Sequence, residues 1–270
     1  MAFPHRPRGD ESEEDLSLNE ITKQFIGENL TAGVPTLALK KAPVGTDFSL
    51  ALRQIAARQL LQKKVPQWAE NEDLLFPAPL SIEQCSSEAS ARYKAGLLMG
   101  DTLADLTGGL GVDTYYLSQR FQQTDYVERQ AELCDLAKHN FDVLKADIEV
   151  WNETAETYLQ TCEPKDCFFI DPARRDEHGR KTVSIADCMP DVGALQDKLL
   201  QKAERVMIKL SPMLDISKAL DELRHVKEVH VVAVANECKE LDVVLERAFE
   251  GDPRFVCVNL LTHQPELCFT

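Results

Sequence analysis

The chain has 270 residues, of which 44% are hydrophobic, and it carries a formal net charge of -15 at pH 7. This length predicts one main domain with a small appendage, and the acidic balance argues against extensive sequence-independent binding of nucleic acid, while leaving room for a local basic patch. No apolar run reaches the roughly 18 residues that a membrane helix needs, and the N-terminus lacks the apolar segment of a signal peptide, so we expect a cytoplasmic protein with no membrane contact.

Eight cysteines are spread along the chain without a C-x-x-C pair and without a cluster of cysteine and histidine. This pattern is untypical of a zinc site and of a disulfide framework. We therefore expect no metal and no disulfide, with most cysteines buried as small apolar side chains in a reducing compartment.

The N-terminal part of the chain is predicted to be helical. Residues 1–15 are charged and contain proline and glycine with little to bury, which favours disorder. Within 16–80, apolar residues recur at helical spacing, as Phe48, Leu52 and Ile55 do. We expect a small all-α domain over 16–80.

A further helix is expected just before the pattern changes. Ser81, with Gln84 three residues later, forms the pattern of a capping box, in which the two side chains bond backbone N–H groups at the start of a helix. The residues that follow keep a helical pattern, so we predict a single helix from Ser81 to Gly100.

After Gly100, short apolar runs alternate with helical segments. Such alternation is typical of βαβ units that build a parallel sheet covered by helices on both faces. The last apolar runs follow one another too closely for helical crossovers, which predicts an antiparallel ending. The expected strands are 102–106, 125–128, 148–151, 167–171, 205–210, 228–234, 241–246 and 255–261, and the expected helices are 112–121, 129–144, 153–160, 191–201 and 216–223.

The stretch "DLTGGLGVDT", from Asp105 to Thr114, follows the first expected strand. Ligands of such sheets sit beyond the carboxyl ends of the strands, where glycines let the backbone approach a ligand closely. A tight turn alone is expected to need one glycine rather than three, so the pattern favours a ligand site. The dinucleotide fingerprint G-x-G-x-x-G, started at Gly109, requires glycine or alanine at Thr114, and this mismatch disfavours a nicotinamide cofactor.

Two further acids end expected strands. Glu128 follows the second strand, where a carboxylate can accept hydrogen bonds from both hydroxyls of a ribose. Asp171 ends the fourth strand, and Pro172 fixes the chain after it, which places a rigid carboxylate where it can orient an amino or ring N–H group. The densest basic stretch of the chain comes next, and it either grips phosphate or carboxylate or stays solvated: Arg174, Arg175, Arg180 and Lys181.

Four motifs in this order carry a family resemblance: "SIEQCSSEASARYKA", "DLTGGLGVDT", "DPARRDEHGRKT" and "MIKLSPMLDIS". Together they resemble the bacterial, Bacteroidetes-type class I S-adenosylmethionine-dependent methyltransferases that carry a C-terminal THUMP-like domain. The resemblance covers roughly residues 20–260. It implies a Rossmann-like α/β domain over 81–270, with a seven-stranded, mostly parallel sheet whose last strand is antiparallel. It also implies that the THUMP-like domain is absent from this chain, that S-adenosylmethionine is the cofactor and that RNA is the substrate.

Matched by motif, the resemblance implies roles for individual residues. The cofactor site would consist of Asp105, Thr107, Gly108, Gly109, Gly111, Asp113, Glu128 and Glu153. Asp171 and Pro172 would be catalytic, with Asp171 orienting, and where needed deprotonating, the accepting nitrogen. The substrate side would be lined by Arg174, Arg175, Lys209 and Ser211.

The chain departs from the related base methylases at two places. Ala173 and Arg174 stand where those enzymes keep a second proline and an aromatic ring, so the stacking ring for a flipped adenine is missing and the target atom is open. After the third strand, Glu153 or Thr154 would have to serve beside the adenine of the cofactor. The leading hypothesis is a methyltransferase acting on a base nitrogen of RNA. The alternatives are methylation of a protein or small molecule, a non-catalytic binding module and, last, an NAD-dependent oxidoreductase.

Overall fold

The structure is a computed structural model that describes residues 18–174 and 185–261. The predicted disorder of 1–15 and the predicted role of Arg175 concern residues outside these ranges. Within the two ranges, no helix combines the length and the apolar character needed to cross a membrane.

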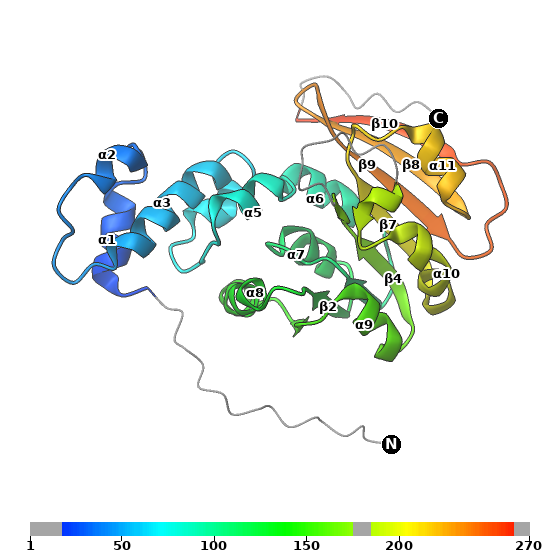
Figure 1. The fold of residues 1–270 in the computed structure, drawn as a ribbon, viewed down its shortest axis with the longest axis horizontal. Coiled ribbons are helices and arrows are strands. Elements are labelled where there is room, and N and C mark those ends of the chain that lie inside the picture. Colours follow the sequence, from blue (N-terminus) through cyan, green and yellow to red (C-terminus); the bar gives the residue numbers. More distant parts are fainter. Residues whose placement is uncertain (1–17, 175–184, 262–270) are drawn as a thin grey trace, which may run out of the picture.

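Helices alone precede the sheet in the described chain, and in Figure 1 they extend as an arm to one side of it. Asparagine and aspartate side chains start two of them: Asn19 accepts from the N–H of Thr22, and Asp47 from that of Leu50. A separate all-α domain over 16–80 stays a prediction. The helices are α1 (Glu20–Glu28), α2 (Val34–Ala38), α3 (Phe48–Leu61), α4 (Pro66–Glu70), α5 (Pro79–Gln84) and α6 (Glu88–Ala95).

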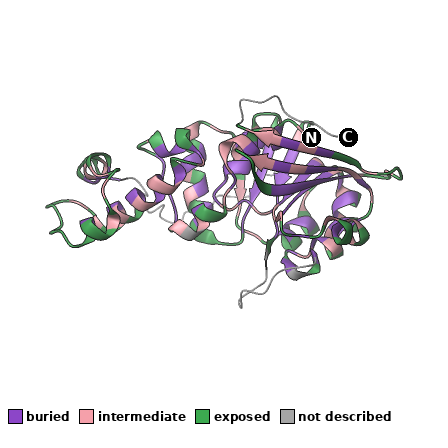
Figure 2. Cartoon of the chain, turned by 90° about the horizontal axis from the view of Figure 1, so that it is seen from above, coloured by how far each residue is buried: buried purple, intermediate pink, exposed green. Residues whose placement is uncertain are grey.

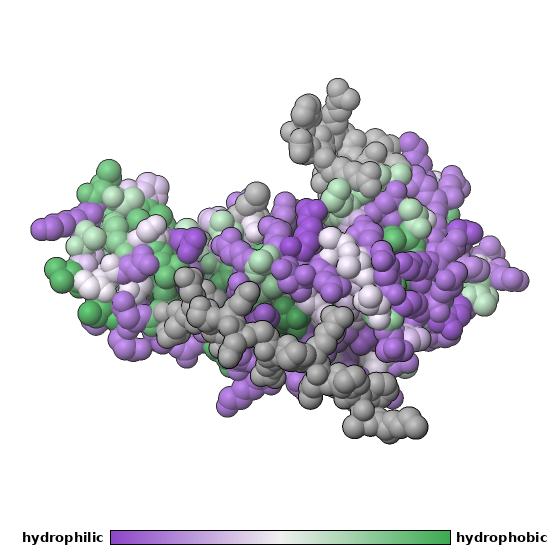
Figure 3. All heavy atoms as spheres, turned by 60° about the horizontal axis from the view of Figure 1, so that its bottom comes forward, coloured by the Kyte–Doolittle hydropathy of each residue, from purple (hydrophilic) through white to green (hydrophobic). Residues whose placement is uncertain are grey.

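The arm has its own apolar contacts, and it is tied to the rest of the chain. Ile26, Leu37 and Ile55 belong to one buried cluster, against which Leu136 of a later helix also packs. Asn140 bonds both the N–H and the carbonyl of Leu75, which fastens the loop after α4 to that same helix. The far end of the arm is the part where hydrophobic residues gather on the surface in Figure 3.

The predicted single helix from Ser81 to Gly100 is wrong. The chain forms α5 and α6 instead, separated by a turn at residues 85–87. Pro79, which suits the first turn of a helix, starts α5 before Ser81, and the Ser87 side chain accepts from the N–H of Ser90 to start α6 anew. The turn between the two helices contributes to the site described below.

Eight strands form the main sheet, in the order β10-β8-β9-β7-β4-β1-β2-β3. Neighbouring strands run parallel except at β9, which is antiparallel to both β7 and β8. Each expected strand overlaps one of these strands: β1 (Thr102–Asp105), β2 (Gln123–Val127), β3 (Ile148–Trp151), β4 (Lys165–Ile170), β7 (Ala203–Leu210), β8 (Val226–Val234), β9 (Glu237–Glu246) and β10 (Arg254–Leu260).

The seven-stranded sheet with an antiparallel last strand is therefore a wrong prediction in two respects. The described sheet has eight strands, and the antiparallel one is β9, the last but one. The final strand, β10, pairs with β8 in parallel along the register Arg254↔Glu228 to Leu260↔Val234. The short connections did signal the reversal at β9, and the run 255–261 did predict a further strand, but neither showed that this strand pairs with β8 in parallel at the edge of the sheet.

Helices cover both faces of the sheet, and Figure 2 shows the buried strands between them. One buried cluster joins the sheet to α9 (Ala155–Thr161), α10 (Val192–Lys202) and α11 (Ile216–Glu222). On the other face, two clusters join it to α4, α6, α7 (Val112–Ser118) and α8 (Ala131–Leu144). Two short strands, β5 (Ala173–Arg174) and β6 (Cys188–Met189), pair beside the sheet, and a single 3-10 turn, η1, spans Ile185–Asp187. This arrangement is a Rossmann-like α/β fold.

Candidate functional site

A cavity of about 950 Å³ opens where the carboxyl ends of the parallel strands meet. Its walls come from the turns after β1, β2, β3, β4 and β7 and from the turn between α5 and α6. The volume suits a cofactor or drug-sized ligand. Most of the predicted site residues line it together: Asp105, Thr107, Gly108, Gly109, Gly111, Asp113, Glu128, Glu153, Asp171, Pro172, Lys209 and Ser211. Arg174 belongs to β5.

The glycine turn is shaped by packing beneath it. A Cβ at Gly108 would lie 2.1 Å from the ring of Tyr126, and Gly111 has a φ of +83° with the ring of Phe141 only 2.9 Å from its would-be Cβ. Gly109 has a φ of +54°, but its would-be Cβ meets nothing closer than 3.8 Å, so space opens above it. Packing thus accounts for two of the three glycines, more than the one we expected.

Asp105 is buried directly below this turn. Its carboxylate accepts hydrogen bonds from the Thr114 hydroxyl at 2.6 Å and from the Thr107 N–H at 3.0 Å. Burial raises the pKa of Asp105 to about 7, against the lowering effect of these hydrogen bonds. Thr114, which disfavours a dinucleotide site in the sequence, therefore has a structural role, because it supports the acid at the end of β1.

Glu128 is fixed at the end of β2. Its Oε2 accepts from the N–H of Gly109 at 3.1 Å and its Oε1 from the N–H of Gln130 at 2.9 Å. The residue is only 8% exposed, so its carboxylate keeps one orientation. Each oxygen retains a free lone pair, which leaves the capacity to accept hydrogen bonds from two hydroxyl groups.

Asp171 and Lys209 form an ion pair across the ends of β4 and β7. The N–H of Asp171 also donates to the Thr107 hydroxyl at 2.6 Å, which links the end of β4 to the glycine turn. Burial opposes the charge of Lys209, but the carboxylates of Asp171 and Asp113 outweigh it and raise the pKa of this lysine. Lys209 thus does not reach out to solvent, as a lysine at a strand end often does; it holds the Asp171 carboxylate in place.

Sequence reasoning missed a group of buried charges behind the cavity, formed by Lys94, Glu240 and Asp242. Lys94 binds Glu240, and neither oxygen of Asp242 has a hydrogen-bond partner. Burial and the neighbouring Glu240 raise the pKa of Asp242 well above its ordinary value. The sequence gives no signal for the burial of the two acids, because Glu240 and Asp242 alternate with Leu241 and Val243, as polar residues on the solvent face of a strand do.

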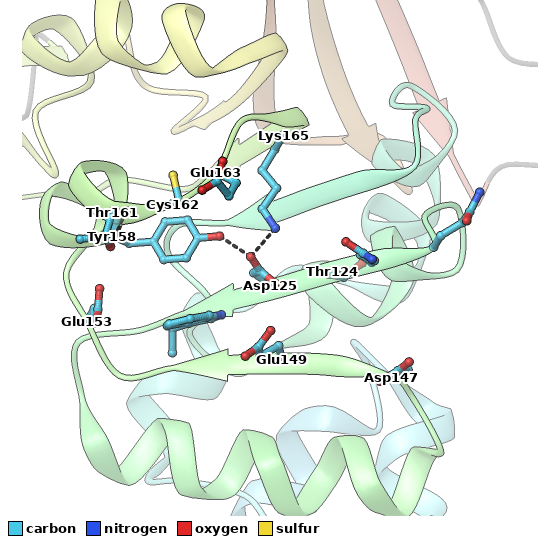
Figure 4. Close-up of a pocket in the computed structure, with 13 residues that line it drawn as sticks. Thr124, Asp125, Asp147, Glu149, Glu153, Tyr158, Thr161, Cys162, Glu163 and Lys165 are labelled. Atoms are coloured by element: carbon cyan, nitrogen blue, oxygen red, sulfur yellow. Dashed lines mark hydrogen bonds and ion pairs between the residues drawn. The ribbon is translucent and has the colours of Figure 1, made fainter. Parts of the chain in front are cut away.

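A second cavity, of about 670 Å³, lies against β2 and β3 near α9 (Figure 4). Figure 4 shows Tyr158 and Lys165 pointing at Asp125, which accepts from the tyrosine hydroxyl and pairs with the lysine at 2.6 Å. None of the glycine turn lines this cavity, and Glu153 is the one residue that lines both. Glu153 Oε2 is buried without a hydrogen-bond partner, which leaves an acceptor at the border of the two spaces.

The described residues hold no group of three or more histidine, cysteine and acidic side chains placed to bind a metal. Their cysteines are free thiols.

No protein-family model matches this chain, and no curated protein matches it either. Among solved structures, the chain is similar to a "putative methyltransferase" from Porphyromonas gingivalis W83, with 30% identity and a TM-score of 0.78 over 93% of this chain and 64% of that one. The chain thus spans somewhat less than two thirds of that protein. This likeness supports the Rossmann-like fold assigned above.

Weaker likenesses relate the chain to other solved structures. One is an rRNA methylase from Streptococcus thermophilus, with 18% identity and a TM-score of 0.42 over 58% of this chain and 93% of that one. Another is a "putative methyltransferase" from Streptococcus mutans in complex with SAH, with 15% identity and a TM-score of 0.43 over 64% of this chain and 99% of that one. At these levels the two structures add no argument about this chain.

The glycine turn makes a stability prediction. Gly108→Ala drives a methyl group into the ring of Tyr126, and we expect the free energy of unfolding to fall by about 1–3 kcal/mol, the usual cost of overpacking. In Gly109→Ala the new methyl group has room, and the only penalty comes from placing alanine in a left-handed backbone conformation. We expect this penalty to lower the free energy of unfolding by about 1 kcal/mol. Urea denaturation of both variants measures the difference, and equal losses would contradict the packing explanation.

Asp105 makes the stability of the protein depend on pH. Its pKa rises from 3.8 in the unfolded chain to about 7 in the folded one, so the stability that its protonated form provides is complete below pH 3.8 and is lost as the pH rises through about 7. Between pH 5 and pH 7 we expect the wild type to lose about 2 kcal/mol relative to Asp105→Asn, which does not titrate. Unfolding curves for the two proteins that stay parallel over this range would show that Asp105 is ionised throughout.

Proposed function

We propose that this chain is an S-adenosylmethionine-dependent methyltransferase that acts on a base nitrogen of RNA. The observation that carries the proposal is the meeting, in one cavity, of a glycine turn with open space above Gly109, a carboxylate fixed at the end of β2 and a second carboxylate at the end of β4. The motif resemblance and the similar Porphyromonas protein support the same activity.

The residues present fit this cofactor. Glu128 keeps a lone pair on each carboxylate oxygen for the two ribose hydroxyls, and the buried, unpartnered Oε2 of Glu153 suits an amino group such as that of adenine. Gly109 leaves room for the methionine end, next to the carboxylates of Asp105 and Asp113. These acids suit the positive charge that the methionine part of the cofactor carries.

The cofactor, when bound, supplies a methyl group already activated on a sulfonium sulfur. The protein then needs to align the accepting nitrogen with the S–CH₃ bond, and the fixed Asp171 carboxylate accepts a hydrogen bond from that N–H group. Transfer would form the N–C bond and break the S–C bond with S-adenosylhomocysteine as the leaving group, and the proton of the nitrogen would pass to the Asp171 carboxylate and then to water. Lys209 keeps Asp171 oriented throughout, and Pro172 holds the backbone after it.

RNA as substrate rests on the family resemblance and on the basic stretch that begins directly after Pro172, with Arg174, Arg175, Arg180 and Lys181. The net charge of -15 opposes RNA binding by this chain alone, so a partner or further segment with positive charge would assist it. Methylation of a protein or a small molecule is the second candidate, favoured by the acids that line the cavity.

Cofactor binding is the first test of the proposal. We expect isothermal titration calorimetry to show binding of S-adenosylmethionine and none of NAD. Glu128→Gln should weaken that binding by about 1–3 kcal/mol, since a charged hydrogen-bond acceptor is lost. Glu132→Gln, an exposed acid in the first turn of α8, serves as the matched control and should bind as the wild type does. Binding of NAD instead would overturn the proposal.

The acceptor side is tested by Asp171→Asn. We expect methyl transfer to be abolished while S-adenosylmethionine still binds, because this side chain faces the acceptor. Lys209 loses its partner in that variant, so Asp171→Asn/Lys209→Met, without the stranded charge, is measured beside it. Mass spectrometry of nucleosides in RNA from cells with the wild-type gene, either variant or no gene supplies the readout. Unchanged nucleosides in the strain without the gene would exclude RNA as the substrate.

A further inference from the structure

We propose that Lys94 of α6 is a positioning residue of the cofactor cavity, which holds the carboxylate of Asp113 beside the glycine turn. The inference rests on the proposed function, since the glycine turn is the proposed cofactor site. It assigns to the helices before the sheet a part in the active centre.

Lys94 is fully buried, with a side-chain exposure of 0%. Its ammonium donates to both carboxylate oxygens of Glu240, at 2.9 and 3.0 Å, and to the hydroxyl of Ser86 at 2.9 Å. It also lies 3.1 Å from Asp113 Oδ1. All three N–H groups of the ammonium are thus used on groups of β9 and of the α5–α6 turn.

Asp113 is held from two sides by residues that precede the sheet. The Ser86 hydroxyl donates to its Oδ2 at 2.7 Å, and the Lys94 ammonium faces its Oδ1. That second contact is an ion pair without hydrogen-bond geometry, because Oδ1 is buried and has no hydrogen-bond partner. Asp113 lines the cavity two residues after Gly111. Ser86 and Lys94 therefore fix the Asp113 carboxylate where this residue lines the cavity.

The same network reaches the acceptor side. Glu240 and Asp242 lie two residues apart on β9, and Asp242 is the register partner of Lys209 on β7. The carboxylates of Asp113 and Glu240 raise the pKa values of both Lys94 and Lys209, so the two lysines share these acids. In the absence of Lys94, Asp113 and Glu240 would depend on Lys209 as the nearby cation, and they would draw it away from its ion pair with Asp171.

The charge on Asp113 depends on its neighbours. Burial raises the pKa of this carboxyl, but Lys94, Lys209 and the Ser86 hydroxyl more than offset it and lower the pKa below 3.8. Loss of Lys94 removes the largest of these lowering effects. The effect of burial then dominates, and we expect the pKa of Asp113 to rise. Asp113 interacts electrostatically with five charged or titratable groups: Lys94, Lys209, Asp105, Asp242 and Cys85.

The test uses calorimetric titration of the full chain with S-adenosylmethionine at pH 6.5 and pH 8.5. Lys94→Met strands two buried carboxylates, so the main variant is Lys94→Met/Glu240→Gln, which removes one charge of each sign. At both pH values we expect this variant to bind about tenfold more weakly than the wild type, because the Asp113 carboxylate loses the ammonium group that holds it. Lys138→Met, at an exposed lysine of α8, is the control and should match the wild type.

Coupling to Asp113 separates positioning from support of the fold. Asp113→Asn should weaken binding by a similar factor at both pH values, and its addition to Lys94→Met/Glu240→Gln should cause little further loss. A merely structural role predicts that the two losses add in full. Full additivity, or wild-type affinity of Lys94→Met/Glu240→Gln, would overturn the inference.

Two further measurements keep this test independent of folding and of the proposed function. If Lys94→Met/Glu240→Gln does not fold, Ser86→Ala removes only a hydroxyl from Asp113 and should still weaken binding; wild-type affinity would then contradict the inference. Carboxyl NMR of Asp113 without ligand should show its pKa below 3.8 in the wild type and above it once Lys94 is replaced. If the wild type binds no S-adenosylmethionine, the proposed function is wrong. If replacing Lys94 leaves the pKa of Asp113 unchanged, only the inference about Lys94 is wrong.

Discussion

The carboxyl edge of the sheet holds more buried charge than the fold could tolerate without Lys94 and Lys209. A carboxylate taken out of water is costly unless a cation or several hydrogen bonds compensate it. Lys209 pairs with Asp171, and Lys94 compensates Asp113 and Glu240. These two side chains allow several acids to stand around one cavity in fixed positions.

Some of the remaining acids are compensated in other ways. Glu128 depends on backbone N–H groups, and Asp105 depends on Thr114 and the N–H of Thr107, with a pKa near 7. Asp242 has no hydrogen-bond partner, and burial raises its pKa well above the ordinary value. The cavity thus combines carboxylates held in fixed positions with acids that can gain or lose a proton. This combination suits the proposed cofactor, whose sulfonium charge disappears when the methyl group is transferred.

Much of the sheet and of the candidate site followed from the sequence. Apolar runs located the strands, and because parallel strands end at one edge, the acids Asp105, Glu128 and Asp171 had to lie close together. Side-chain packing could not be predicted from the sequence. The pattern did not show that Tyr126 lies under Gly108, and it did not show that Ser87 starts a new helix after the turn. A local pattern reports which residues prefer an element, but it does not report which distant residues meet there.

Lys94 illustrates the same limit. In the sequence it is a lysine in a charged helix, and such a residue normally faces solvent. Its burial depends on Glu240, which is 146 residues away in the chain. Local periodicity carries no information about a contact of that separation, so the helices before the sheet could be predicted as an appendage and not as a wall of the cavity.

A crystal structure of the chain with S-adenosylhomocysteine would show directly which cavity binds the cofactor. We expect the homocysteine part above Gly109, the ribose hydroxyls on the carboxylate of Glu128, and the sulfur open toward Asp171. Ligand bound in the second cavity beside Asp125 and Lys165, with the glycine turn empty, would contradict this expectation.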